Sequence, residues 1–310
     1  SFKKAITINS QYSMAYYNLG TTYRFIGDFK EAIKSFHESI KINPNFAQAH
    51  NNLGIAFQED GNLEKALNSF QKALKLNPLL CNAYNNLGTV YQEFGDLENA
   101  IKFFKNAINM DANFAESHWN LSLAELLNEN YIQGWSRYDW RWKTKDPLIP
   151  HAQPKISKWT GKLLQKDEKL LVVSEQGLGD TLQFMRYIPY LRSKGIDVSF
   201  CAQEKLHDLI RASKIDLNPL TTAEANEVRE GQWIPLLSVP RYLEVTPQKP
   251  IVSKPYIMPS YDLIHKWKSI LSKEKRPIIG LNWQGDPSTE KNYQGRSIPL
   301  ETFSKISDKN

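Results

Sequence analysis

The sequence predicts an α-solenoid followed by an α/β domain with a parallel sheet. Residues 1–142 repeat with a period of 34, and from residue 170 onward short apolar runs alternate with helix-like segments. A repeat of that length is typical of stacked helix pairs. Strands that alternate with helices favour a doubly wound parallel sheet. The 310 residues are enough for two or three domains with their own cores.

Four columns of residues, each spaced 34 apart, define the repeat. They are Leu19, Leu53, Leu87 and Leu121; Ala32, Ala66 and Ala100; Phe36, Phe70 and Phe104; and Pro44 and Pro78. In the first helix Tyr16, Leu19, Gly20 and Tyr23 share one side, and the glycine lets the paired helix approach closely. The pattern resembles the tetratricopeptide repeat, in which each unit buries its apolar stripe against its neighbours.

Both ends of the array depart from the repeat. The opening "SFKKAITINS" matches only the end of a unit, so we expect the chain to be a fragment of a longer protein. The oligomeric state stays open, because an exposed solenoid end can pair with a copy of itself. The fourth unit keeps Leu121 but carries Gly134 and Tyr138 in its later columns, among several tryptophans. Such a unit suits docking onto another domain.

An asparagine column also recurs every 34 residues, at Asn18, Asn52, Asn86 and Asn120. Asparagine is a poor helix former, so helix propensity does not explain the column. The amides have donors and acceptors that can pair with the backbone of an extended peptide. The column resembles the asparagine ladder of protein O-linked N-acetylglucosamine transferases, which implies a protein or peptide partner. The alternatives are that the amides tie adjacent repeats together or are inherited by duplication.

Residues 143–169 form a basic, proline-rich connector between the two parts. Pro147, Pro150 and Pro154 interrupt any helix. We expect the connector to lie across the next domain with Trp159 buried. Basic residues beside an aromatic are one feature of nucleic-acid binding, but the connector has only this one aromatic, so the sequence does not favour a nucleic-acid partner.

Composition limits the function classes. The net charge of +6 and the pI near 9.0 are compatible with an anionic ligand. No apolar run approaches the length of about 20 residues that a membrane helix needs, so no membrane span is expected. Cys81 and Cys201 fall in different predicted domains, which favours a reducing, cytoplasmic location. The six histidines show no ligand spacing with these cysteines, so no metal site is expected.

The loop "SEQGLGD", Ser174–Asp180, follows the predicted strand 170–174 and precedes a predicted helix in "TLQFMRYIPYLRSKG". In a parallel sheet ligands bind beyond the carboxyl ends of the strands, where this loop lies. It lacks the third glycine of a dinucleotide loop and the lysine of a P-loop. Asp180 and Gln183 have the spacing of a capping box, so one interpretation is a helix cap only.

A resemblance adds a second interpretation of this loop. The run "LLVVSEQGLGDTLQFMRYIPYL", with Trp159-Thr160-Gly161 before it and "IGLNWQGDPSTEKNYQGRSIPLETF" after it, resembles bacterial tetratricopeptide proteins with a glycosyltransferase-9-like domain, related to the heptosyltransferases. The resemblance implies a GT-B architecture of two Rossmann-like domains. It implies that Asp180 is the catalytic base, with Glu175 as a substitute base. Gln176, Gly177, Gly179 and Gln183 would form the acceptor side of the loop.

The same resemblance implies a nucleotide-diphosphate sugar as donor substrate, with no other cofactor and no metal. The Rossmann-like acceptor-side domain would span residues 170–260, and residues 261–310 would start a truncated donor domain. The candidate donor-phosphate residues are Gly285, Lys291, Arg296 and Ser297. Because most of that domain is missing, we expect the complete protein to transfer sugar and this chain alone to be inactive.

Two function classes therefore stay open. The first is a metal-independent glycosyltransferase whose repeats select a protein or glycan acceptor. The second is a non-catalytic protein–protein interaction scaffold that binds extended peptides in the repeat groove. The sequence does not identify the sugar, the nucleotide or the acceptor.

Overall fold

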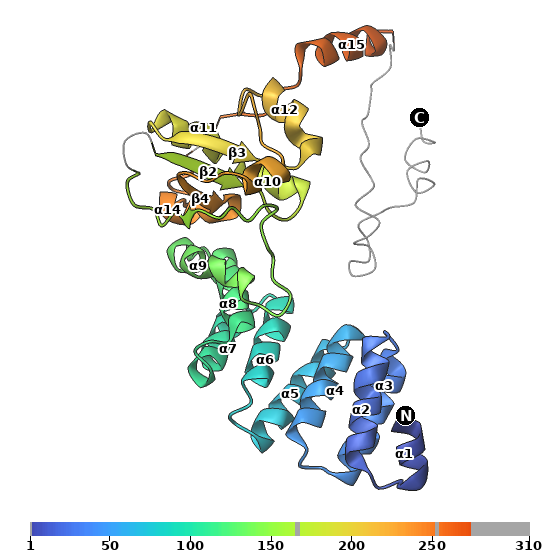
Figure 1. Ribbon diagram of the computed structural model, residues 1–310. Helices are drawn as coiled ribbons and strands as arrows, with labels where there is room; N and C mark the ends of the chain where they lie inside the picture. The colour runs from blue at the N-terminus through green and yellow to red at the C-terminus, as the bar shows by residue number, and fades with distance from the viewer. Residues whose placement is uncertain (1, 165–167, 252–253, 274–310) are drawn as a thin grey trace. The chain divides into compact units, whose positions relative to one another are not determined.

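A computed structural model describes residues 2–164, 168–251 and 254–273. The chain forms two compact units, residues 1–257 and 258–310. The first unit contains helical repeats and a small parallel sheet, both visible in Figure 1. Within the described part of the second unit lies α15 (Tyr261–Leu271), which begins where the Ser260 side chain accepts a hydrogen bond from the Leu263 amide.

The repeats fold as pairs of helices, as the columns predict. The helices are α1 (Phe2–Ile8), α2 (Ser13–Phe25), α3 (Phe29–Ile42), α4 (Ala47–Glu59), α5 (Leu63–Leu76), α6 (Cys81–Glu93), α7 (Leu97–Met110), α8 (Ala115–Leu127) and α9 (Tyr131–Arg137), followed by the 3₁₀ helix η1 (Tyr138–Trp142). The first helix of a unit is even-numbered and the second helix is odd-numbered, from α2 to α9.

Each of the three regular units is closed by the same local contacts. Side chains of Asp28, Asn62 and Asp96 cap the second helices by accepting hydrogen bonds from amides three residues on. The phenyl ring of Phe104 fills the space that a side chain at Gly88 would need, since a Cβ atom there would lie 2.5 Å from it. This explains why glycine and phenylalanine recur together in the sequence.

The apolar core of the array is shared between neighbouring units. Phe36 packs with Leu53 and Ala56 of the next unit, and Phe70 packs with Leu87 and Val90 in the same way. No unit therefore buries its own stripe alone, as expected of a solenoid.

The sheet has four parallel strands in the order β1-β4-β2-β3. The strands are β1 (Ser157–Lys158), β2 (Lys169–Val173), β3 (Asp197–Cys201) and β4 (Gln232–Pro235). The connecting helices are α10 (Leu178–Phe184), α11 (Tyr187–Ser193), η2 (Glu204–Leu206), α12 (His207–Ala212) and α13 (Thr222–Asn226), and η3 (Leu236–Ser238) and α14 (Val239–Leu243) follow β4. In register, Val172 pairs with Phe200 on one side and Ile234 on the other.

Both faces of the sheet are covered, as a parallel sheet requires. Leu170 and Val172 of β2 face a large core that includes Met185, Ile188 and Leu191. Leu171 and Val173 face a smaller cluster with Cys201 and Ala225. Trp159 is 5% exposed and belongs to the large core, so the connector lies across the domain as expected.

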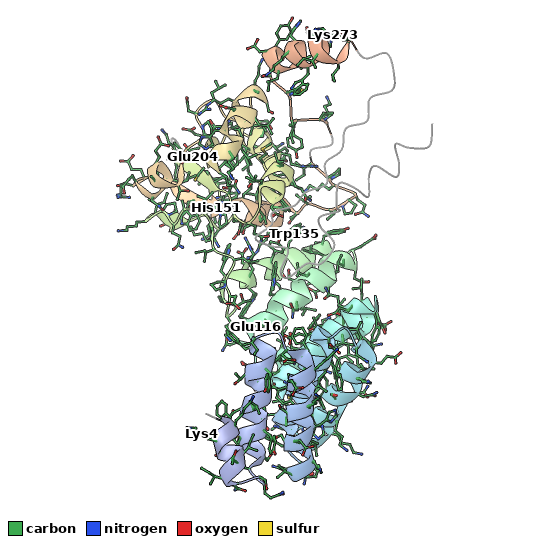
Figure 2. The ribbon with its side chains drawn as sticks, turned by 90° about the vertical axis from the view of Figure 1, so that its right-hand side faces the viewer. Lys4, Glu116, Trp135, His151, Glu204 and Lys273 are labelled. Carbon is green, nitrogen blue, oxygen red and sulfur yellow. The ribbon has the colours of Figure 1, made fainter. Side chains whose placement is uncertain are left out.

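The last repeat unit docks onto this α/β part. Tyr138 belongs to the large core of the sheet, and Trp119, Leu123 and Trp135 pack against that core. Trp135, labelled in Figure 2, also donates a hydrogen bond from Nε1 to the carbonyl of Val245 at 3.2 Å. The α/β part therefore covers the apolar end of the array.

The helix predicted after "SEQGLGD" differs from expectation in two ways. It is broken into α10 and α11, because Pro189 has no amide hydrogen to donate to the carbonyl of Met185. It also begins earlier, with Gly177 rather than Asp180 at the N-cap position. The prediction of a capping box between Asp180 and Gln183 is therefore wrong.

Among the described residues, no helix has the length and apolar character to cross a membrane.

Candidate functional site

The array curves toward its first helices. Helices α2, α4, α6 and α8 contact one another in succession, whereas contacts between the second helices α3, α5 and α7 are sparser within the described residues. The asparagine column lies on these first helices. Seven residues after each asparagine, on the same side of the helix, come Phe25, Glu59, Glu93 and Leu127. We call these two columns, Asn18, Asn52, Asn86, Asn120, Phe25, Glu59, Glu93 and Leu127, the inner face.

The asparagines tie successive repeats together. The Nδ2 groups of Asn86 and Asn120 donate to the Oδ1 atoms of Asn51 and Asn85, each at 3.0 Å. Asn52 donates in the same way to the Tyr17 hydroxyl at 3.0 Å. Hydrogen bonds between successive repeats, one of the alternatives left open by the sequence, are thus present. The sequence did not lead us to the acceptors Tyr17, Asn51 and Asn85, although "NN" in two successive units indicates a second column beside the first.

The ties leave groups of these amides unused, although Asn52 both donates to Tyr17 and accepts a hydrogen bond from Asn51 Nδ2 at 3.3 Å. Half-buried Asn86 and Asn120 each spend one N–H on the tie, and no hydrogen bond to their Oδ1 atoms is found within the described residues. The side chain of Asn18 has no partner there either. These groups remain able to bond to a ligand.

The second column of the inner face is acidic in the middle and apolar at its ends. Arg24 donates to Glu59 at 2.9 Å, and Gln58 donates to Glu93 at 2.5 Å. Burial raises the pKa of the Glu59 carboxyl, and the nearby Arg24 only partly offsets this effect. Phe25 and Leu127 are 90% and 62% exposed.

Asp180 lies in the first turn of α10, at the carboxyl end of β2. Its Oδ2 atom accepts a hydrogen bond from the Gly177 amide at 3.0 Å, so one oxygen caps the helix. The side chain is half-buried, and Oδ1 has no hydrogen-bond donor among the described residues. Gly179 has open space where a side chain would begin. The aspartate is therefore a cap that keeps one oxygen free.

Glu175 is placed quite differently and does not fit the role of substitute base. Its side chain and that of Arg141 are both fully buried and pair at 2.7 Å. Its carboxylate also accepts a hydrogen bond from the Leu237 amide at 3.0 Å. A base must reach a substrate hydroxyl, whereas every oxygen of Glu175 is used inside the protein. Arg141, to which no sequence pattern points, comes from the last repeat unit.

Gln176 has a backbone that side chains rarely adopt, with φ at +60°. Its Nε2 atom is buried without a well-formed hydrogen bond, in the neighbourhood of the buried Tyr138 hydroxyl. Burial raises the pKa of Tyr138 to about 12. Strain of this kind is common at functional sites, and here the glutamine lies between the buried Glu175 and the exposed Gly177.

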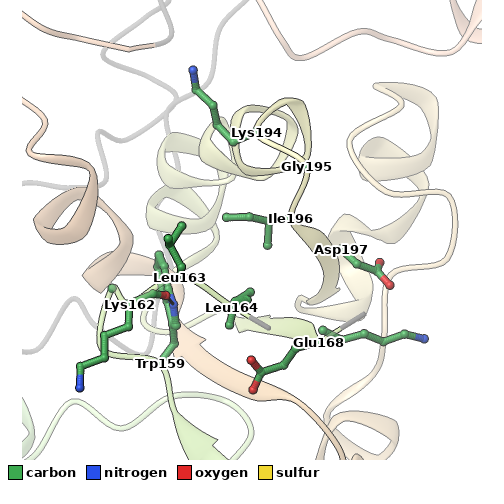
Figure 3. A pocket seen from close by; sticks show the side chains of 11 residues that line it. Trp159, Lys162, Leu163, Leu164, Glu168, Lys194, Gly195, Ile196 and Asp197 are labelled. Carbon is green, nitrogen blue, oxygen red and sulfur yellow. Dashed lines mark hydrogen bonds between the residues drawn. The ribbon is translucent and has the colours of Figure 1, made fainter. Parts of the chain in front are cut away.

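Two pockets of the α/β part lie away from Asp180. One, drawn in Figure 3, has a volume of about 750 Å³ and lies at the amino ends of β2 and β3, where Lys162 and Lys194 point their charged ends outward. It is at the edge opposite to the one where ligands of parallel sheets bind. Another, of about 390 Å³, lies beside Trp142, Lys158 and Trp233. The Lys158 ammonium covers the Trp142 ring at 3.4 Å.

The four candidate donor-phosphate residues, Gly285, Lys291, Arg296 and Ser297, lie outside the described residues. Gln183, by contrast, is described: it lies on α10, where its carbonyl accepts a hydrogen bond from Arg186. In the part of the chain that the structure describes, no group of three or more histidine, cysteine or acidic side chains is arranged to hold a metal ion.

Comparison with known proteins identifies the repeats. Tetratricopeptide-repeat models match residues 13–46 and 45–113. The solved structure of MamA is 24% identical, with 45% of this chain and 81% of that chain covered and a TM-score of 0.41. PilF of Pseudomonas aeruginosa is 19% identical, with 45% and 64% covered and a TM-score of 0.42.

YrrB, described as a TPR protein with an unusual peptide-binding site, is 18% identical, with 45% of this chain and 72% of that chain covered and a TM-score of 0.40. No curated protein matches the chain. The columns, the helix pairs and the two matching models agree, and residues 13–113 are tetratricopeptide repeats.

Proposed function

We propose that the chain is a protein–protein interaction scaffold that binds an extended polypeptide along the inner face of its repeats. The observation that carries the proposal is the row of asparagines on the first helices, whose amides keep unused groups beside the ties between repeats. A row at a fixed spacing suits a partner that is itself periodic, such as an extended backbone.

The chemistry of the amide fits that partner. An asparagine side chain donates through its nitrogen and accepts through its oxygen, as the peptide group does. Each such bond contributes about 0.5–1.5 kcal/mol net, so one of them binds a peptide weakly. Four on one solenoid act together without selecting a particular side chain.

The test must separate binding from the tie between repeats. Asn86→Ala removes both the tie and the unused amide groups. Tyr17→Phe removes only the acceptor of the Asn52 tie and leaves every asparagine in place. We expect Asn86→Ala to weaken binding of a capped, fluorescein-labelled 15-residue peptide by roughly threefold to tenfold, because it loses one or two hydrogen bonds. Tyr17→Phe should leave the affinity unchanged.

Fluorescence anisotropy measures the affinity, and circular dichroism confirms that both variants stay helical. Equal affinities for the wild type and Asn86→Ala would assign the column to the ties alone and would contradict the proposal.

We also propose sugar transfer as a second candidate for the complete protein, on one observation. "SEQGLGD" lies at the carboxyl end of β2, and the chain moves from β3 across β2 to β4. Ligands of open α/β sheets bind where the strand order reverses in this way. Asp180, with its free oxygen, is the residue proposed as general base toward an acceptor hydroxyl of a protein or glycan. The Rossmann-like and GT-B architecture, the nucleotide-sugar donor and the role of residues 261–310 belong to this proposal.

A matched pair of variants tests the base. Asp180→Asn weakens the cap on Gly177 and removes the base. Glu224→Gln weakens the analogous cap on the Thr221 amide, where a 2.8 Å hydrogen bond is formed, and is far from the loop in sequence. Sugar transfer by the complete protein is measured as nucleotide release from a panel of nucleotide-sugars. The rate should fall by roughly 10²-fold or more in Asp180→Asn and not in Glu224→Gln. If the two variants lose equal activity, Asp180 is a cap and nothing more.

A further inference from the structure

Charge is sorted sharply between the two kinds of helix in the repeats. The second helices α3, α5 and α7 carry the lysines Lys30, Lys34, Lys41, Lys65, Lys72, Lys75, Lys102 and Lys105. The first helices α2, α4, α6 and α8 carry no lysine, and their one arginine is Arg24. The protein is basic as a whole, yet its inner face is not.

The single cation of the first helices is already neutralised. The Arg24 guanidinium forms an ion pair with Glu59 at 2.9 Å. The inner face therefore has no unpaired cationic side chain that could neutralise a carboxylate of a bound peptide, whether on an acidic side chain or at the peptide's C-terminus.

Glu93 is the contrasting case. It occupies the position of Glu59 one repeat later, but the residue that reaches it is the neutral Gln58 rather than an arginine. Its side chain is exposed, and within the described ranges no lysine, arginine or histidine forms an ion pair with it. Asn86 lies seven residues earlier on the same side of α6, so the unpaired carboxylate and the half-used amide face the same strip of solvent.

We infer that the inner face binds an internal, extended segment that carries a lysine or arginine, and that Glu93 pairs with this cationic side chain. The inference rests on the proposed scaffold function and narrows it to one class of partner. The asparagines hold the backbone without regard to sequence, and Glu93 selects the charge. One repeat further on, the exposed Leu127 offers an apolar contact to the same segment.

Three peptides that differ in one residue test this selection. Each is a 15-residue segment of alanine, serine and threonine, acetylated and amidated, with lysine, glutamine or glutamate at its centre. Exposed ion pairs contribute about 0.2–1 kcal/mol, so the lysine peptide should bind roughly 1.4-fold to fivefold tighter than the glutamine peptide. The glutamate peptide should bind more weakly than both, and 0.5 M salt should reduce the differences.

Two charge-matched variants locate the effect. Glu93→Gln keeps an oxygen for the Gln58 contact and should remove the preference for lysine without weakening the glutamine peptide. Glu98→Gln removes an exposed acid of the second helix α7 and should leave the preference intact. Equal affinity for the three peptides, or a preference for lysine that survives Glu93→Gln, overturns the inference while the scaffold function stands. If no peptide binds, the scaffold function fails and takes the inference with it.

Discussion

The regular repeats and the last repeat unit share a helix-pair frame but differ at the same positions. In the three regular units, glycine meets phenylalanine: Gly20 with Phe36, Gly54 with Phe70 and Gly88 with Phe104. In the last unit these columns hold Ser122 and Tyr138, and the alanine column holds Gly134. Ser122 donates to the carbonyl of Gly134 at 2.8 Å, and Tyr138 turns into the core of the sheet.

Of these departures, Tyr138 enters the core of the α/β part, whereas Ser122 and Gly134 contact each other within the last unit. All eight tryptophans of the chain lie beyond residue 118, and none lies in the regular units. Tryptophan fluorescence therefore reports on the chain from residue 119 onward and not on the regular units, whereas circular dichroism is dominated by the helical array. Variants on either side of the joint can be followed separately.

The largest effect is expected at the buried pair between the two parts. Arg141→Met leaves Glu175 buried without its cation, so the α/β part should lose about 3–5 kcal/mol of unfolding free energy. Urea unfolding followed by tryptophan fluorescence measures the loss. The double variant Arg141→Met/Glu175→Leu should lose less than the single variant. A single-variant loss below about 1 kcal/mol would mean that the joint does not depend on the pair.

A smaller effect is expected inside the regular repeats. Gly88→Ala places a Cβ atom 2.5 Å from the ring of Phe104, and overpacking of this kind costs about 1–3 kcal/mol. The loss should appear in thermal unfolding followed by circular dichroism. Gly179→Ala, where nothing lies within 4 Å of the added atom, is the control and should change little.

In the last unit, restoring the residue of the repeat pattern should destabilise the protein. Ser122→Gly restores the glycine of the column but removes the buried bond to Gly134, so the unfolding free energy should fall by about 1–2 kcal/mol. The control is Ser69→Ala, whose hydroxyl bonds only within its own helix, to the carbonyl of Lys65. If restoring the repeat residue stabilises the protein, the serine is a tolerated deviation rather than a docking adaptation.

The smallest effect concerns the turn of the last unit. Gly27, Gly61 and Gly95 have φ between +79° and +82°, and Glu129 takes the same position with φ at +61°. A side chain in this region costs about 1–2 kcal/mol, part of which glycine returns as chain entropy. Glu129→Gly should therefore stabilise the last unit by about 0.5–1 kcal/mol, measured as a shift of the tryptophan-detected urea midpoint. Gly95→Ala should destabilise its own unit by a similar amount.

The repeats were predictable from sequence because their physics is periodic. A glycine that must admit a phenylalanine recurs every 34 residues, and the period locates both helices and the turn. The parallel strands near 170 and 197 were predictable from their apolar runs. The start of α10 was not, because a glycine N-cap leaves no side-chain signal and the aspartate that caps it stands three residues later.

The candidate site was predictable only in part, because only its periodic residues leave a pattern in the sequence. The asparagine column is periodic and was found, but its partners Tyr17, Asn51 and Asn85 stand in a neighbouring column, and the spacing alone does not show that their contacts cross between repeats. The pairing of Arg141 with Glu175 joins the last repeat unit to the α/β part, so no local pattern indicates it. The cytoplasmic location and the donor-phosphate residues stay predictions.

Photo-crosslinking from within the array shows most directly whether a peptide binds along the inner face. A photoreactive phenylalanine analogue replaces Thr89, three residues after Asn86 on α6, or Lys102, an exposed residue of the second helix α7. We expect the capped lysine peptide to crosslink to position 89, to be displaced by excess unlabelled peptide, and not to crosslink to position 102. Crosslinking only at position 102, or equal crosslinking at both positions that unlabelled peptide does not reduce, would contradict binding along the inner face.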